Sequence, residues 1–185
     1  IPSLINCEKN CKAVTVSGTS TTVSTNNSTT AVGFGYLSNF AERNSFSKKA
    51  IVEEYIEGVE VSVETISWKG QHTILTITDK VTTGPPHFVE LAHHQPSSLS
   101  NEIQEKIESE TIKCLNALNI NFGAGHSEFK ITSTGEVYVI EVGARMGGDF
   151  IGSHLVELST GYDFLEGVIN IALGNYEKPI LKNNN

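Results

Sequence analysis

Two glutamates that a β-hairpin would bring face to face are the residues of this chain best suited to chemistry. Strand-like runs at residues 126–131 and 137–142 flank a turn signal at residues 134–135. A turn centred there places Glu128 directly opposite Glu141. Directly opposed carboxylates lie roughly 5 Å apart at Cβ and repel by about 3 kcal/mol at an effective dielectric of about 20. We therefore expect a cation between them.

Residue alternation gives the predicted hairpin one apolar side and one polar side. The expected apolar side consists of Phe129, Ile131, Tyr138, Ile140 and Val142. The expected polar side consists of His126, Lys130, Gly143 and the two glutamates. An extended continuation keeps Arg145 on the polar side, where its guanidinium could bind a phosphate or carboxylate. Mg²⁺ suits such a site because proteins hold it with one or two carboxylates plus substrate phosphates. An ordinary hairpin with solvated glutamates is the alternative.

Composition and charge narrow the class of protein. The 185 residues suffice for one large domain or two small lobes. A net charge of -8, with no basic run, argues against a nucleic-acid partner. No apolar stretch approaches bilayer length and no signal peptide is visible, so we predict a cytoplasmic protein without a membrane partner. Cys7, Cys11 and Cys114 lack zinc-site spacing and suit a reducing compartment. Because the chain starts at Ile1, we expect a fragment of a longer protein.

Hydrophobic periodicity predicts a mixed chain with an antiparallel sheet in its middle. The expected strands cover residues 1–5, 13–16, 50–56, 61–68 and 73–78. The expected helices cover residues 29–46, 100–118, 151–158 and 163–173. Ser100 is expected to cap the second of these helices, which has an apolar stripe of Ile103, Ile107, Cys114, Leu115 and Leu118.

Two connections are candidates for phosphate binding. Residues 17–22 form a loop of small hydroxyl residues that could wrap a phosphate, or could be a simple hairpin turn. Residues 79–100 are expected to form a long irregular connection. Lys80 would stand at its start, at the end of a strand, where an ammonium group could meet phosphates or be solvated.

Several separated stretches resemble the ATP-grasp superfamily of carboxylate–amine ligases and carboxylases. IVEEYIEG (residues 51–58) followed by EVSVE (60–64) resembles the hinge strand that holds adenine and ribose. TDK (78–80) is similar to a phosphate-facing segment. GHSEF (125–129) and VIEVGAR (139–145) resemble the paired metal-binding strands. The resemblance covers most of residues 50–174.

The resemblance implies an α+β ATP-grasp fold, with antiparallel sheets, packed helices and two lobes of which the small one is truncated. Residues 1–57 would belong to the small lobe and residues 58–174 to the large lobe, which would hold the metal and phosphate site. Residues 175–185 would form a tail.

The resemblance also implies roles for individual residues. Glu128 and Glu141 would bind Mg²⁺, with Mn²⁺ as an alternative, bridging the phosphates of ATP. The catalytic residues would be Arg145, which would stabilise the transferring phosphoryl group or acyl phosphate, and Lys80, which would approach phosphate oxygens. The cofactor-binding residues besides Lys80 would be Glu53, Glu54, Tyr55 and Ile56 at adenine, and Glu60 at the ribose.

The implied activity is that of an ATP-dependent ligase. The complete enzyme would turn a carboxylate into an acyl phosphate for attack by an amine or similar nucleophile, whereas the fragment alone would be inactive. Its partners would be small-molecule carboxylates and amines, and a homodimer is left open. Gly143 stands where family members often carry an asparagine ligand, and the loop at 17–22 lacks the usual second glycine. These departures keep open a non-catalytic nucleotide- or metal-binding module with a decayed site.

Overall fold

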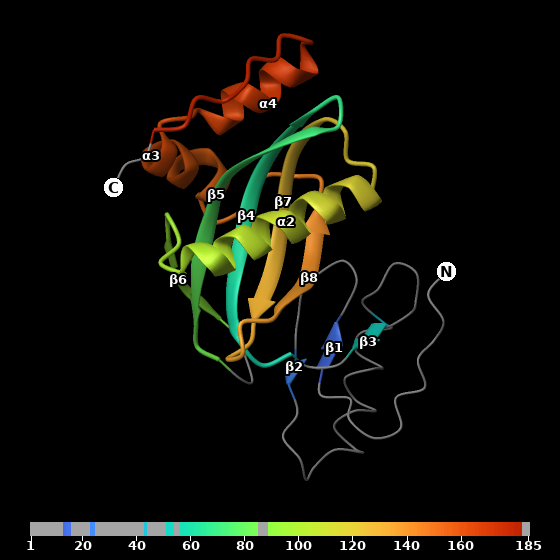
Figure 1. The fold of residues 1–185 in the computed structure, drawn as a ribbon, viewed down its shortest axis with the longest axis vertical. Coiled ribbons are helices and arrows are strands. Elements are labelled where there is room, and N and C mark those ends of the chain that lie inside the picture. The colour runs from blue at the N-terminus through green and yellow to red at the C-terminus, as the bar shows by residue number, and fades with distance from the viewer. Residues whose placement is uncertain are drawn as a thin grey trace. The chain divides into compact units, whose positions relative to one another are not determined.

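The computed structural model divides the chain into two compact units (Figure 1). One unit comprises residues 1–56 and 82–91, and the other comprises residues 57–81 and 92–185. The structure describes residues 13–15, 23–24, 43, 51–53, 56–84 and 89–182. Several predictions lie outside the described residues: the strand at 1–5, the loop at 17–22, most of the helix at 29–46, Glu54, Tyr55 and the end of the tail.

The first unit contains a small antiparallel sheet. Its strands are β1 (Ala13–Thr15), β2 (Val23–Ser24) and β3 (Ile51–Glu53), in the order β2-β1-β3. Ala13 pairs with Ser24 on one side and with Glu53 on the other. The strand expected at residues 13–16 is therefore present as β1, and the strand expected at residues 50–56 is present at residues 51–53 but does not include Ile56.

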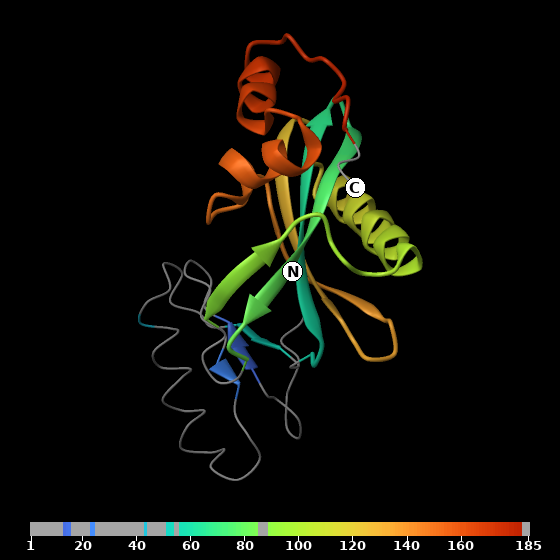
Figure 2. The same cartoon turned by 90° about the vertical axis from the view of Figure 1, so that its left-hand side faces the viewer.

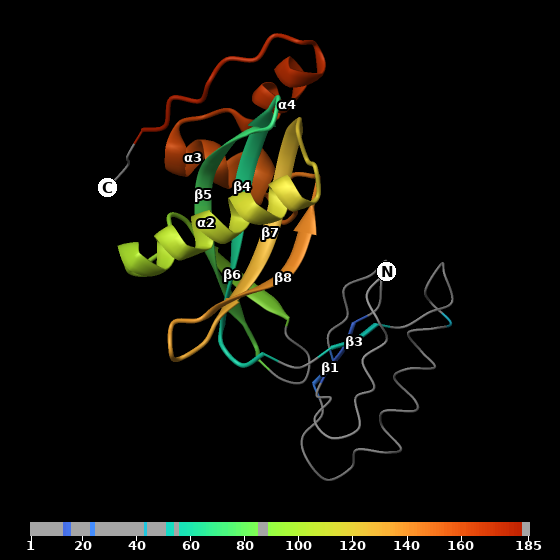
Figure 3. The ribbon, with the colours of Figure 1, turned by 45° about the vertical axis from the view of Figure 1, so that its right-hand side comes forward.

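The second unit is built on a five-stranded sheet in the order β6-β5-β4-β7-β8 (Figure 3). Its strands are β4 (Val59–Trp68), β5 (Gln71–Thr82), β6 (Glu90–His94), β7 (Gly123–Ile131) and β8 (Val137–Gly143). β4 lies in the middle and pairs antiparallel with both β5 and β7. The predicted hairpin between β4 and β5 is confirmed, with Lys69 and Gly70 at positive φ in its turn.

The connection expected at residues 79–100 is more regular than the sequence indicated. β5 continues through Lys80 to Thr82, and residues 90–94 form the edge strand β6. Lys80 therefore lies within a strand, directly opposite Glu60, and the prediction that it ends a strand is wrong. Residues 90–94 lack the alternation of apolar and polar residues on which the prediction of strands depended.

Helices cover both faces of the five-stranded sheet, which is the predicted α+β architecture (Figure 2). α2 (Asn101–Ala117) lies on one face, whereas η1 (Ile151–Leu155), α3 (Val156–Thr160) and α4 (Phe164–Ala172) lie on the other. The core under α2 contains Val61, Val63, Ile77, Ile107, Phe129 and Ile131. The core under α3 and α4 contains Ile66, Leu75, Ala124, Val156, Phe164 and Ile171. Among the described residues, no helix is long and apolar enough to cross a bilayer.

The helices expected at residues 100–118, 151–158 and 163–173 are present, with corrections in detail. Ile107 and Leu115 of the expected stripe on α2 are completely buried, but Leu118 is 56% exposed. Ser100 is the N-cap residue, yet its side chain makes no capping hydrogen bond. The helix expected at 151–158 begins as a π-helical turn and becomes α-helical only at Val156.

The central hairpin has the predicted pairing at Glu128 and a different one near its turn. Glu128 pairs with Glu141, as the sequence predicted, but Phe129 pairs with Val139. The register shift between Glu128 and Phe129 is a β-bulge, which inserts one extra residue into β8. The prediction that Tyr138 and Ile140 share the apolar side with Phe129 is therefore wrong. Val137 and Val139 take that side, and Tyr138 pairs with Lys130 on the polar side.

Candidate functional site

Three rows of residues, all polar except Gly143, cross one face of the second unit's sheet. Because directly paired residues share a face, the register assigns the first row to Lys80, Glu60, Lys130 and Tyr138. The second row is Thr78, Ser62, Glu128 and Glu141. The third row is Thr76, Glu64, His126 and Gly143. We call these twelve residues the polar face.

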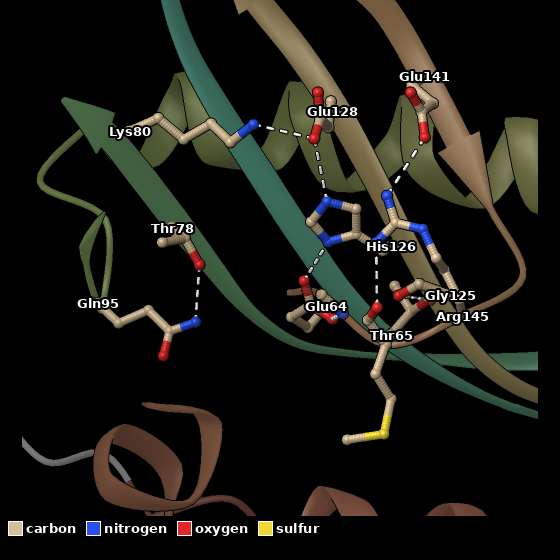
Figure 4. A network of polar contacts seen from close by, with 12 residues as sticks. Glu64, Thr65, Thr78, Lys80, Gln95, Gly125, His126, Glu128, Glu141 and Arg145 are labelled. Atoms are coloured by element: carbon tan, nitrogen blue, oxygen red, sulfur yellow. Dashed lines mark hydrogen bonds and ion pairs between the residues drawn. The ribbon is translucent and has the colours of Figure 1, made fainter. Parts of the chain in front are cut away.

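Lys80 joins two carboxylates on this face. Its Nζ lies 3.1 Å from Glu60 Oε1 and 2.9 Å from Glu128 Oε1. The Lys80 side chain is only 2% exposed, so these ion pairs are sheltered from water. An ammonium group with two charged partners can be buried at acceptable free energy, whereas an isolated one cannot. Lys80 therefore links the first row to the second (Figure 4).

His126 lies between two carboxylates. Its Nδ1 bonds to Glu64, and its Nε2 lies 3.2 Å from Glu128 Oε1. Burial alone would lower the pKa of His126, but its hydrogen bonds to Glu128 and Glu64 and their charges outweigh burial and raise that pKa to about 9. The ring is therefore a cation at neutral pH, with both nitrogens as donors.

Glu128 is the point where these contacts converge. Burial alone would raise the pKa of Glu128, but His126 and Lys80 overcome this effect and lower that pKa to about 2. The carboxylate thus stays ionised at neutral pH. Glu128 does not face an unbalanced repulsion from Glu141, because two cations hold it.

Glu141 and Arg145 form the exposed edge of the site. Arg145 Nη2 lies 3.3 Å from Glu141 Oε1, and its Nη1 donates to the carbonyl oxygen of Met146 at 3.1 Å. The side chain of Arg145 is 50% exposed and that of Glu141 is 45% exposed. Figure 4 shows Glu128 and Glu141 on neighbouring strands with their carboxylates on the same side of the sheet. Arg145 lies on the predicted side as well.

The residues present fit a hard divalent cation. Glu128 and Glu141 supply carboxylate oxygens from directly paired positions, and Mg²⁺ is held by one or two carboxylates plus phosphate oxygens and water. Lys80 and Arg145 add positive charge, each bonded to one of the two glutamates. Such a set can neutralise the spread negative charge of a polyphosphate.

The predicted adenine-binding residues belong to the other unit. Glu53 lies in β3, and Ile56 ends that unit's first segment. Glu54 and Tyr55 lie outside the described residues. The predicted ribose-binding residue Glu60 lies on the polar face, where its carboxylate contacts Lys80.

Sequence reasoning missed Glu64 as part of the site. Its side chain is completely buried, and it contacts both His126 and the backbone N–H of Gly147. The signal was available in the alternation of β4, in which Val61 and Val63 face the core and Ser62 and Glu64 must face the other way. Two acidic residues four positions apart on one strand face would have pointed to Glu60 and Glu64 together.

Comparisons with known proteins place the chain among proteins with an ATP-grasp domain. A family model for the ATP-grasp domain matches residues 34–153. Human carnosine synthase 1 is 27% identical over 124 residues, which cover 67% of this chain and 15% of that protein.

Two solved structures share the fold. L-amino acid ligase from Bacillus licheniformis matches with a TM-score of 0.72 and 27% identity, covering 92% of this chain and 40% of that chain. The biotin carboxylase domain of Hydrogenobacter thermophilus 2-oxoglutarate carboxylase, solved with MgADP, matches with a TM-score of 0.75 and 22% identity, covering 91% of this chain and 38% of that one. At that identity, the second likeness concerns the fold alone.

The chain spans less than half the length of each of these three proteins. The matched residues nevertheless include β4, β5, β7 and β8, which carry the whole polar face. With more than half of its residues matched by the family model, the chain belongs to the ATP-grasp family.

Proposed function

We propose that the full protein is an ATP- and Mg²⁺-dependent ligase that activates a carboxylate as an acyl phosphate for attack by an amine or a similar nucleophile. The observation that carries this proposal is the direct pairing of Glu128 with Glu141, each bonded to a cationic side chain. Phosphoryl transfer depends on positioning and on neutralising spread negative charge, and this arrangement suits both. Similarity to an L-amino acid ligase and to carnosine synthase supports a ligase.

Glu128 and Glu141 would hold Mg²⁺, which neutralises phosphate charge when it is bound. Arg145, half exposed beside Glu141, would bind the phosphoryl group as it leaves ATP and joins the substrate carboxylate. Lys80, which forms ion pairs with Glu60 and Glu128, would also bind phosphate oxygens. Glu53, Glu54 and the backbone at Tyr55 and Ile56 would meet adenine, and Glu60 would take the ribose hydroxyls.

The test is ADP release by the full protein, measured with panels of carboxylates and amines. We expect ADP release to require a carboxylate and to yield a coupled product only when an amine is also present. Glu128→Gln and Glu141→Gln should each lower kcat/KM by about 100-fold or more, because each removes charge that acts on the transferring group.

Glu102→Gln is the matched control, since Glu102 also pairs with a cation, Lys106, but on the exposed surface of α2. This variant should keep the activity of the parent. Unchanged kcat/KM in both site variants would refute the proposed roles. We also expect the present chain alone to show no turnover, because the reaction needs both lobes around ATP.

Gly143 favours one alternative, a nucleotide- or metal-binding module without catalysis. A Cβ at position 143 would lie 3.3 Å from Arg145 Cγ, so the arginine side chain takes part of the space that a larger ligand residue would need. A thermal shift of the full protein with Mg-ATP, without ADP release for any substrate pair, would support this alternative. Turnover would exclude it.

A further inference from the structure

Glu64 is a carboxylate enclosed by protein and bonded through both oxygens. It is 0% exposed on the central strand β4. Oε1 bonds to Nδ1 of His126, and Oε2 accepts a hydrogen bond from the backbone N–H of Gly147 at 2.9 Å. Burying a carboxylate costs several kcal/mol unless its partners are well placed. His126 connects Glu64 to Glu128, whereas Gly147 connects it to the segment that carries Arg145.

The first partner leads to Glu128. The His126 ring bonds to Glu64 through Nδ1 and to Glu128 through Nε2, the latter at 3.2 Å. A ring that is bonded at both nitrogens has a fixed orientation, in the same way that an outer partner fixes a metal-binding histidine. Glu64 therefore restricts where the Glu128 carboxylate can lie (Figure 4).

The second partner leads to Arg145. Gly147 follows Arg145 by two residues, and a Cβ at position 147 would lie 2.5 Å from Glu64 Oε1 and 3.0 Å from His126 Nδ1. The backbone of this segment thus rests directly on the pair formed by Glu64 and His126. Arg145 in turn donates to the carbonyl oxygen of Met146, so its guanidinium is tied to the backbone that Glu64 holds.

We propose that Glu64 is a positioning residue of the nucleotide site, which sets Glu128 through His126 and the Arg145 segment through Gly147. One buried carboxylate then fixes the separation between the metal-binding glutamates and the phosphate-binding arginine. This inference rests on the proposed function, since it assigns Glu64 to the same site. It goes beyond the residues proposed to contact the ligand, because Glu64 is fully enclosed by protein.

The experiment measures binding of Mn²⁺ with ADP to the full protein, by the electron paramagnetic resonance signal of free and bound Mn²⁺. Glu64→Gln keeps the shape of the side chain and removes its charge. We expect it to weaken Mn²⁺ binding in the presence of ADP by about 10- to 100-fold, as for other residues that orient metal ligands. The spectrum of the Mn²⁺ that remains bound should also change.

Thr65→Val is the matched control. Thr65 is the next residue on β4, is completely buried, faces α2 and donates to the carbonyl oxygen of Gly125 at 3.2 Å. This variant should lower the thermal midpoint of unfolding without changing Mn²⁺ affinity or the spectrum.

Three outcomes contradict the inference or its basis. A change of less than twofold in Glu64→Gln would overturn the positioning role. So would equal losses of affinity in Glu64→Gln and Thr65→Val, because these would follow from lost stability alone. If the parent protein bound no Mn²⁺ with ADP, the proposed function itself would fail, and this result is distinct from the other two.

Discussion

Two halves of one sheet face are built by the same strands from opposite kinds of residue. In one half, Ile66, Leu75 and Ala124 pack under α3 and α4. In the other, Glu64 and His126 begin the polar face only one same-face step along β4 and β7. The apolar half is held by burial, whereas the polar half is held by ion pairs that hydrophobic residues of similar volume would match or exceed in stability. The difference supports the proposal that the polar half serves binding.

The largest expected effect is the loss of a helix side chain that packs on the apolar half. Phe164 is 1% exposed in the core under α4, so Phe164→Ala should lower the free energy of unfolding by about 3–5 kcal/mol. Leu165 is the control, because it is 50% exposed on the same helix and its replacement by alanine should cost less than about 1 kcal/mol. Urea unfolding measures both. Equal losses would contradict the statement that the apolar half is held by burial.

The contribution of the polar half to the free energy of unfolding should depend on pH. The pKa of His126 is raised from 6.5 to about 9, so its contribution to stability is complete below pH 6.5 and is lost as pH rises through 9. The pKa of Glu128 is lowered from 4.5 to about 2, so its contribution is complete above pH 4.5 and is lost as pH falls through 2. Stability from these two groups should therefore be greatest between pH 4.5 and 6.5.

Urea unfolding at a series of pH values, without divalent cations, tests this window. Between pH 6.5 and 9, the free energy of unfolding should fall by on the order of 1–3 kcal/mol. His126→Gln should remove this slope and leave the midpoint insensitive to pH over the same range. A parent protein whose stability does not change above pH 6.5 would show that His126 is not held as a cation.

Two adjacent glycines give a smaller and sharper test of the contact between the Arg145 segment and the sheet. A Cβ at position 147 would collide with Glu64 and His126, whereas one at position 148 would meet nothing within 4 Å. We expect Gly147→Ala to cost about 1–3 kcal/mol, because its neighbours are buried and cannot move aside freely. Gly148→Ala should change stability by less than about 1 kcal/mol in either direction. Similar thermal midpoints for the two variants would mean that the segment does not rest on Glu64.

The sequence was sufficient to predict the pair of Glu128 and Glu141 in the polar half, but not the bulge beside that pair or the contacts of Glu64. Glu128 lies opposite Glu141 as predicted, but the pairs nearer the turn, such as Ile131 with Val137, differ by one residue from the register that a turn at residues 134–135 would fix. The bulge restores the predicted pair of Glu128 and Glu141. The bulge between that pair and the turn was not predictable, since an inserted residue leaves no clear mark on an apolar run such as residues 139–140. The alternation of β4 could have placed Glu64 on the polar face, but its bonds to His126 and Gly147 could not be predicted, because only the fold brings these distant segments together.

The smallest expected effect on stability comes from the pair at the exposed edge of the polar face. Glu141 and Arg145 are 3.3 Å apart but about half exposed, so a double-mutant cycle with Glu141→Gln and Arg145→Gln should give a coupling of about 0.2–1 kcal/mol. The coupling should shrink further in high salt, because water and ions screen exposed charges. Binding of Mn²⁺ with ADP should nevertheless fall in both single variants, since these side chains would meet the ligand directly. If these residues form a site, replacing them should change the free energy of unfolding little and the affinity for Mn²⁺ with ADP strongly. If the glutamates of the hairpin only face water, replacing them should change neither quantity.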